Sequence, residues 1–148
     1  MHLKNLEKIL TEYGQTVVDD YKAALKERGY KIAETVTTTV DIAGTTYYVI
    51  INLAEYWKYI EHGRRAGAKM PPEKPIIEWI RRKGIEPRDK RLKEKQFTFI
   101  IRKSISEKGI APKPFLAESL KKNRNIVDEI ETAFKVDIYE NLANELKI

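Results

Sequence analysis

The chain has 148 residues, of which 42% are hydrophobic and 34% charged, and its formal net charge is +6. This length and composition predict one globular domain spanning residues 1–148. The chain contains no cysteine, which excludes disulfides, thiolate catalysis, zinc fingers and iron–sulfur clusters. No apolar run approaches the roughly 18 residues of a membrane span, and the first residues lack the apolar stretch of a secretion signal, so we expect a soluble protein made in the cytoplasm.

Residues 3–28 are predicted to form one long amphipathic helix. Apolar residues recur there every three or four positions, which is the spacing of a helix face: Leu3, Leu6, Leu10, Tyr13, Val17, Tyr21 and Leu25. Gly29 is a plausible end of this helix. Gly14 interrupts the pattern and should cost about 1 kcal/mol relative to Ala.

Residues 30–53 change to the two-residue period of a β-hairpin, with Ala43-Gly44 as the turn. Apolar residues fall on even positions before the turn and on odd positions after it: Ile32, Val36, Val40 and Ile42, then Tyr47, Val49, Ile51 and Leu53. The run from Tyr47 to Ile51 is apolar on both faces. This predicts a strand that is covered on both sides or that meets another subunit on its outer face.

The positive charge is concentrated in the middle of the chain. Residues 58–113 contain 17 Lys and Arg against 7 Asp and Glu, a net of +10, whereas the other residues contain 11 against 15, a net of −4. We therefore treat residues 64–110, approximately, as a basic insert. The charge favours an acidic partner, either nucleic acid or a protein surface, but a solvated, solubilising surface explains it equally well.

Short helices are predicted within and beside this insert. Residues 54–63 form an aromatic helix or turn ending at Gly63, and residues 64–72 an exposed basic loop. Residues 73–83 form a helix that ends at Gly84. The pattern of residues 92–107 fits a helix or a strand, and its length favours a helix.

The last third of the chain is predicted to be extended and then helical. Two prolines keep residues 111–114 extended, and residues 115–146 again show a helical spacing, with a candidate break at Asn123–Asn125. The predicted fold class is α+β: long N- and C-terminal helices pack on a small antiparallel β-sheet, and short extra helices lie in the basic central insert.

The sequence contains none of the motifs of catalysis or cofactor binding that we sought. It lacks the nucleophile elbow of hydrolases, the phosphate-binding P-loop, the dinucleotide glycine motif and the zinc-binding His-Glu-x-x-His. His62 beside Glu61 is the one candidate acid–base pair, as in a nuclease-like toxin, but it fits an ordinary helix end better. Asp19-Asp20 fits an exposed helix face. We therefore predict a protein that is not an enzyme and has no cofactor and no metal site.

Nonspecific nucleic-acid binding is the main alternative function. Basic residues interleaved with the aromatic Trp57, Tyr59 and Trp79 could hold phosphates and stack bases. The basic set consists of Arg64, Arg65, Lys69, Arg81, Arg82, Lys83, Arg88, Lys90, Arg91, Lys93 and Lys95. No known DNA- or RNA-binding signature accompanies them, and Trp79 lies among isoleucines.

Two segments resemble a family of tailed-phage proteins. The first is Tyr56-Trp57-Lys58-Tyr59-Ile60-Glu61-His62-Gly63-Arg64, and the second is Gly109-Ile110-Ala111-Pro112-Lys113-Pro114-Phe115-Leu116. Together with the order of the elements, they are similar to the gene-product-ten-like minor tail components, also described as tail-completion or head–tail joining proteins. This sequence differs from the family in having His62 at a position more often aromatic, and in its long basic stretch, residues 66–108.

The resemblance implies a virion structural protein at the head–tail junction, assembled in the host cytoplasm. Such proteins form rings, often hexameric, between connector and tail-tube proteins, and we expect the same partners here. Nonspecific contact with passing DNA is also open, but a strongly basic lumen would hold DNA that must slide, which favours protein contacts. The candidate interface residues are Tyr56, Trp57, Tyr59, Arg64, Arg65, Lys69 and Phe115.

Overall fold

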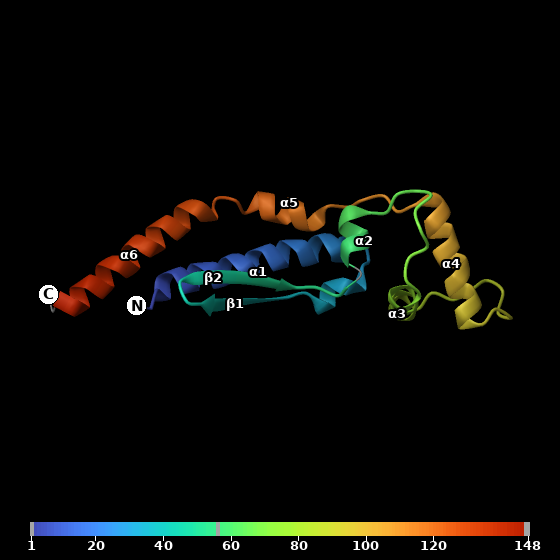
Figure 1. The fold of residues 1–148 in the computed structure, drawn as a ribbon, viewed down its shortest axis with the longest axis horizontal. Helices are drawn as coiled ribbons and strands as arrows, with labels where there is room; N and C mark the ends of the chain where they lie inside the picture. The colour runs from blue at the N-terminus through green and yellow to red at the C-terminus, as the bar shows by residue number, and fades with distance from the viewer. Residues whose placement is uncertain (1, 56, 147–148) are drawn as a thin grey trace. The chain divides into compact units, whose positions relative to one another are not determined.

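The computed structural model describes residues 2–55 and 57–146. The chain divides into two compact units: unit 1 comprises residues 1–53 and 116–148, and unit 2 comprises residues 54–115. The fold is α+β, as predicted, with long terminal helices and a two-stranded antiparallel sheet among the described residues (Figure 1). None of the described helices is both long and apolar enough to cross a membrane.

Helix α1 (Lys4–Glu27) is the central element of unit 1. Its buried face contains Leu6, Leu10, Val17, Tyr21 and Leu25, which confirms the predicted spacing. The helix ends where predicted: Gly29 has a φ of +76°, and the Tyr30 N–H donates to the Leu25 carbonyl over 2.9 Å. A left-handed glycine after the last turn closes a helix in this way at no steric cost.

The hairpin consists of β1 (Thr37–Ala43) and β2 (Thr46–Asn52), joined at Gly44, whose φ is +62°. The first strand begins later than predicted, because Ile32 lies in a short 3₁₀ helix, η1 (Lys31–Thr35). The Thr35 hydroxyl donates to the Ile32 carbonyl over 2.7 Å, a local bond that competes with extended structure. Ile32 is buried all the same. The spacing of the apolar residues therefore predicted its burial correctly, but the predicted strand at this residue is wrong.

The two faces of the hairpin differ in exposure. The cross-strand pair Val40 and Val49 lies on the half-buried face that packs on α1. On the opposite face, Tyr48 is 50% exposed and Ile50 39% exposed. This chain therefore covers β2 on one face only, so the expectation of a strand covered on both sides is wrong, and contact of the outer face with another subunit stays a prediction.

Helix α1 lies close to the hairpin at Gly14. A Cβ atom at this position would lie 2.6 Å from Thr38 Oγ1 and 3.0 Å from Val49 Cγ1. Glycine lowers the stability of the helix at this position, but its lack of a side chain allows α1 to pack closely on the strands.

We expect Gly14→Ala to destabilise unit 1 even though alanine favours helices. The gain in helix propensity is about 1 kcal/mol, whereas overpacking costs typically 1–3 kcal/mol, so the net effect should be a loss that urea denaturation can measure. In a Thr38→Ala background the cost of Gly14→Ala should be smaller, because the nearest atom is gone. An unfolding free energy that rises in the single variant would contradict the close packing.

The C-terminal segment is broken where the sequence suggested, into α5 (Phe115–Lys122) and α6 (Ile126–Leu146). At the break, the Asn123 side-chain amide donates to the Ser119 carbonyl and to Asp20, each over 2.8 Å. Lys122 lies 3.7 Å from the same Asp20 carboxylate. Asp20, interpreted from sequence as part of an exposed face, is therefore partly buried and fastens this turn to α1.

Helix α6 runs antiparallel to α1 and packs against it (Figure 1). Helix α1 thus contacts the hairpin and also α6. The predicted packing of a terminal helix on the sheet holds for α1, whereas the main contact of α6 is with the other terminal helix.

Unit 2 contains α2 (Trp57–His62), α3 (Glu73–Lys83) and α4 (Glu94–Lys108). The bounds of α3 match the prediction, and Gly84 ends it with a φ of +62°. The ambiguous segment is helical, as its length suggested. The backbone N–H of Lys93 donates to Gln96 Oε1 over 3.0 Å, which caps the first turn of α4. Arg81 of α3 pairs with Glu94 of α4 at 2.6 Å.

Candidate interaction surfaces

The two segments that carry the family resemblance pair with each other in unit 2. Arg64 and Ile110 exchange backbone hydrogen bonds of 2.8 and 2.7 Å. Next to them, the Lys113 N–H donates to the Ile60 carbonyl over 2.8 Å. Two stretches about fifty residues apart in sequence therefore form one local structure, which we call the clasp (residues 57–64 and 109–115).

Two glycines make the clasp possible. Gly63 has a φ of +65°, and a Cβ there would lie 2.3 Å from the Ile110 carbonyl oxygen and 2.7 Å from the Pro112 nitrogen. Gly109 has a φ of +73°, and its Cβ would lie 2.4 Å from the Arg64 carbonyl oxygen. Both positions combine a left-handed backbone with contact against another backbone, so only glycine fits without displacing the main chain.

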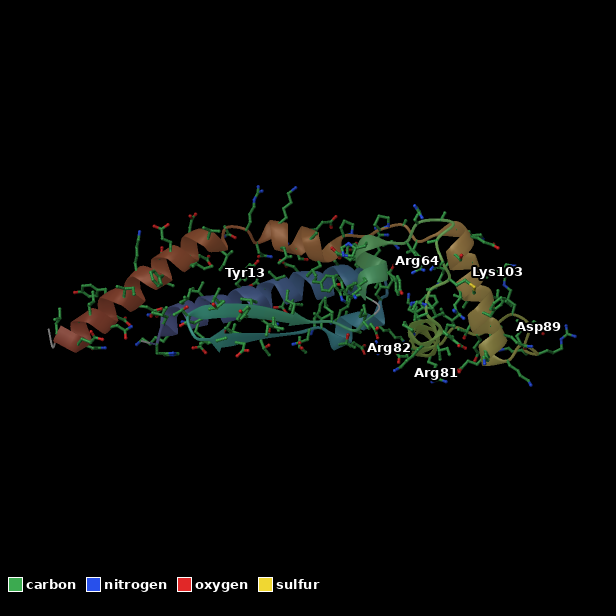
Figure 2. The ribbon with its side chains drawn as sticks, viewed as in Figure 1. Tyr13, Arg64, Arg81, Arg82, Asp89 and Lys103 are labelled. Carbon is green, nitrogen blue, oxygen red and sulfur yellow. The ribbon has the colours of Figure 1, made fainter. Side chains whose placement is uncertain are left out.

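The loop after Gly63, predicted to be exposed, is fastened at several points. The Arg64 guanidinium donates to the Lys69 carbonyl and lies 5.6 Å from the centre of the Tyr59 ring (Figure 2 labels Arg64). The Ser106 hydroxyl of α4 donates to the Ala68 carbonyl over 2.6 Å, and Arg102 of α4 donates to Pro71 over 2.7 Å. Arg64 therefore holds the loop in place.

The predicted interface residues have different exposures. Arg65 and Lys69 are exposed, as a contact surface requires. Half-buried members of the set are Trp57, Tyr59, Arg64 and Phe115. Trp57 packs near His62, with ring centres 5.8 Å apart, and Phe115 begins α5. Tyr56 lies outside the described residues. The structure thus brings most of the set together at the clasp, largely as packing.

The two residues of the candidate acid–base pair differ in exposure. Glu61 is buried and His62 is exposed, since adjacent helical residues point in different directions. Within residues 2–55 and 57–146, no group of three or more His, Cys, Asp or Glu side chains is placed to hold a metal ion.

Unit 2 is basic, with 17 Lys and Arg against 8 Asp and Glu in residues 54–115. Part of this charge is paired locally at exposed positions: Arg81 with Glu94, Lys90 with Glu86, and Arg91 with Asp89. The Arg81 hydrogen bond lowers the pKa of the Glu94 carboxyl, and the Lys90 hydrogen bond lowers that of Glu86. Other exposed cations include Arg65, Lys69, Arg88, Lys95 and Lys103.

Helix α6 exposes more apolar surface than its sequence pattern predicted. Its buried residues are Ala133 and Asp137, whereas many of its large apolar side chains lie open: Val127, Phe134, Val136, Tyr139 (71% exposed), Leu142 and Leu146. The spacing of the apolar residues gave the helix correctly but not the side it buries, because apolar residues occur all around it. Apolar residues on all sides of a helix indicate that more than one of its faces is in contact with other structure, and this pattern could have been recognised in the sequence of α6.

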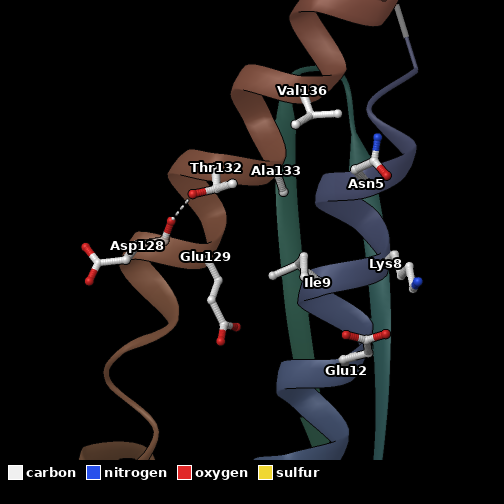
Figure 3. Close-up of a pocket in the computed structure, with 9 residues that line it drawn as sticks. All are labelled: Asn5, Lys8, Ile9, Glu12, Asp128, Glu129, Thr132, Ala133 and Val136. Carbon is white, nitrogen blue, oxygen red and sulfur yellow. Dashed lines mark hydrogen bonds between the residues drawn. The ribbon is translucent and has the colours of Figure 1, made fainter.

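A groove of about 520 Å³ lies between α1 and α6 (Figure 3). Ile9, Ala133 and Val136 form its apolar part. Figure 3 shows Ile9 directed toward α6 and Glu129 directed toward the space between the helices. Three carboxylates and one ammonium group line it: Glu12, Asp128, Glu129 and Lys8. The groove is therefore apolar with a net acidic edge.

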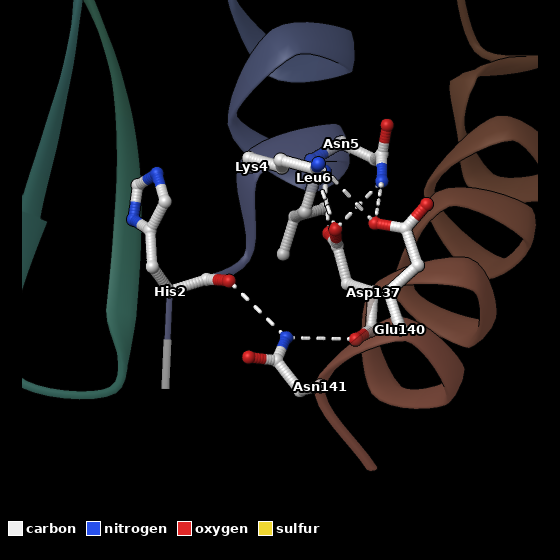
Figure 4. Close-up of polar contacts among 7 residues, drawn as sticks. All are labelled: His2, Lys4, Asn5, Leu6, Asp137, Glu140 and Asn141. Carbon is white, nitrogen blue, oxygen red and sulfur yellow. Dashed lines mark hydrogen bonds and ion pairs between the residues drawn. The ribbon is translucent and has the colours of Figure 1, made fainter. Parts of the chain in front are cut away.

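Beyond this groove, a buried carboxylate joins the two terminal helices (Figure 4). Asp137 of α6 is 1% exposed and accepts hydrogen bonds from the backbone N–H groups of Asn5 and Leu6, over 3.0 and 2.8 Å. The Asn5 side-chain amide adds a third bond of 2.8 Å. Burial acts to raise the pKa of Asp137, but these hydrogen bonds and the charge of Lys4 outweigh it and lower the pKa. Asp137 thus caps the first turn of α1 from another helix.

Comparison with known proteins adds no relative. No family model matches the chain, and neither a curated protein nor a solved structure matches it.

Proposed function

We propose that this chain is a non-enzymatic structural subunit of the head–tail junction of a tailed-phage virion. In this role it assembles with copies of itself into a ring and contacts connector and tail-tube proteins. The observation that carries the assembly part is the exposed apolar surface of unit 1, on the outer face of β2 and on α6. Apolar surface of this kind on a globular protein marks contact with other proteins.

The resemblance to tail-completion proteins supports the place in the virion. Its two short segments form the clasp, so the likeness falls on residues that pack together. The two glycines of the clasp lie directly against backbone atoms, so any larger residue at these positions would clash. Devices of this kind position a scaffold and supply no reacting group.

Self-assembly is tested by native mass spectrometry and light scattering over a range of concentrations. We expect rings from the chain alone or on mixing with connector and tail-tube proteins of the virion. The double variant Tyr48→Ser/Ile50→Thr should weaken assembly, because it removes the outer apolar face of β2. The matched control Thr46→Ser/Asn52→Ser alters polar residues of the same face and should assemble normally. A chain that stays monomeric alone and with those partners would contradict the proposal.

Nonspecific nucleic-acid binding is the second candidate function, favoured by the basic character of unit 2 and by its exposed Arg65, Lys69 and Arg88. A protein with this function should bind random duplex DNA with an affinity that falls steeply between about 50 and 200 mM salt. Tight, salt-sensitive binding by a chain that does not assemble would favour this alternative.

A further inference from the structure

Helix α4 carries an exposed ridge in unit 2. Phe99 is 52% exposed and Ile100 49% exposed, although the preceding Thr98 is fully buried. Lys95 and Lys103 are exposed four residues before and after Phe99, which places them on the same side of the helix. We call Lys95, Phe99, Ile100 and Lys103 the α4 ridge: two apolar side chains between two ammonium groups that are about 12 Å apart along the axis.

The groove between α1 and α6 has the opposite character. It is concave, its middle is apolar at Ile9, Ala133 and Val136, and its ionisable groups are mostly carboxylates. Glu12 lies on one wall and Glu129 on the other, while Lys8 contributes the single positive charge. A volume of about 520 Å³ is in the range of grooves that accept side chains of a partner.

We propose that the α4 ridge of one copy of this chain docks into the α1–α6 groove of a second copy. The inference rests on the proposed self-assembly and names the surfaces that carry it. Phe99 enters the apolar middle of the groove, and Lys95 and Lys103 approach Glu12 and Glu129. This is the packing of an amphipathic helix in a helical groove, with charges that set its orientation.

Charge is the argument for a second copy as the occupant. The groove belongs to unit 1, which has 11 Lys and Arg against 14 Asp and Glu, and the ridge belongs to unit 2, which has 17 against 8. The two surfaces of this one chain are thus both apolar at the centre and opposite in the sign of their charge. Each copy offers one ridge and one groove, so every contact is head-to-tail, and such contacts close into a ring or extend as a filament.

Substitutions on each side test the contact by self-association measured with sedimentation. Phe99→Ser should raise the dissociation constant roughly 30-fold, because an aromatic anchor at the centre of an interface carries much of its energy. The pair Lys95→Glu/Lys103→Glu should weaken assembly about tenfold or more, and so should Glu12→Lys/Glu129→Lys. Combining both pairs in one chain should restore assembly. The matched control Lys90→Glu/Arg91→Glu changes charge outside the ridge and should have little effect.

Cross-linking distinguishes contact between copies from contact within one chain. The chain has no cysteine, so two single-cysteine proteins, Gln96→Cys and Thr132→Cys, can be mixed and treated with a short bismaleimide. We expect a heterodimer of one ridge variant and one groove variant. Replacing Gln96→Cys by Asp41→Cys, on the hairpin, should give little product.

The outcomes separate this inference from the proposed function. Rings that form normally in Phe99→Ser and in both charge variants, with no cross-link, overturn the ridge–groove contact but leave self-assembly standing. A wild-type chain that never assembles overturns both. A cross-link that forms only when both cysteines are in one chain places the ridge in its own groove and contradicts docking between copies.

Discussion

Gly63→Ala should unfold unit 2. Alanine at a φ of +65° is strained by about 1–2 kcal/mol, and its Cβ would lie 2.3 Å from the Ile110 carbonyl oxygen, which is backbone and cannot rotate away. The clasp must open to admit it. We expect a total cost of more than about 4 kcal/mol, the range reached when backbone strain and overpacking combine. Because the chain has two units, hydrogen exchange at the amides of Arg64 and Ile110 is a better measurement than one overall transition.

Gly67→Ala is the matched control for this prediction. Gly67 also has a positive φ, +80°, but nothing lies within 4 Å of its added Cβ. Its cost should be limited to the backbone strain, about 1–2 kcal/mol, and amide protection in the clasp should survive. Equal losses of protection in the two variants would show that the close approach at Gly63 contributes nothing.

Asp137→Ala should have the largest effect in unit 1. The substitution removes the acceptor of two backbone N–H groups in the first turn of α1 and of the Asn5 amide. Leaving buried donors without a partner costs about 1–3 kcal/mol per group, so we expect a loss of about 3 kcal/mol in urea denaturation. The matched control Asp128→Ala alters an exposed carboxylate of the same helix and should change stability by less than about 0.5 kcal/mol.

The same carboxylate predicts a pH dependence with a definite sign. The folded state lowers the pKa of Asp137 below its unfolded value of about 3.9. Its contribution to stability is therefore complete above that value and is lost as the pH falls through the lower folded pKa. Asp137→Asn should be less stable at neutral pH and should lose less stability than the wild type below about pH 4. Parallel acid-denaturation curves for the two proteins would contradict this assignment.

Local chemistry made much of the fold predictable from sequence. The helix at residues 73–83 has a glycine that ends it and isoleucines at helical spacing, and the structure places α3 there. The break near Asn123 was visible because an asparagine side chain competes for nearby backbone groups, as the Asn123 amide does in donating to the Ser119 carbonyl. The strand expected at Ile32 is instead a 3₁₀ helix, in which the Thr35 hydroxyl donates to the Ile32 carbonyl and the Val36 N–H donates to the Ala33 carbonyl.

The candidate surfaces were less predictable because they depend on tertiary contacts. Arg64 was expected to lie in an exposed loop, yet its guanidinium donates a hydrogen bond to the Lys69 carbonyl of that same loop. Asp137 gave no sequence signal, since its partners lie more than 130 positions away. Phe99 and Ile100 could be identified as an outer ridge only once Thr98 was seen to be buried. The pairing of the two resemblance segments likewise needed the fold.

The clasp also bears on how this chain can change in length. The segments that begin and end unit 2 are bonded to each other, through Ile60 and Lys113 and through Arg64 and Ile110. Unit 2 is thus an insertion between Leu53 and Leu116, and hydrogen bonds join its first and last segments. Residues between Arg64 and Ile110 can be gained, lost or exchanged over evolution while these hydrogen bonds keep the two ends of unit 2 together. Natural variation in chain length should accordingly concentrate between residues 65 and 108.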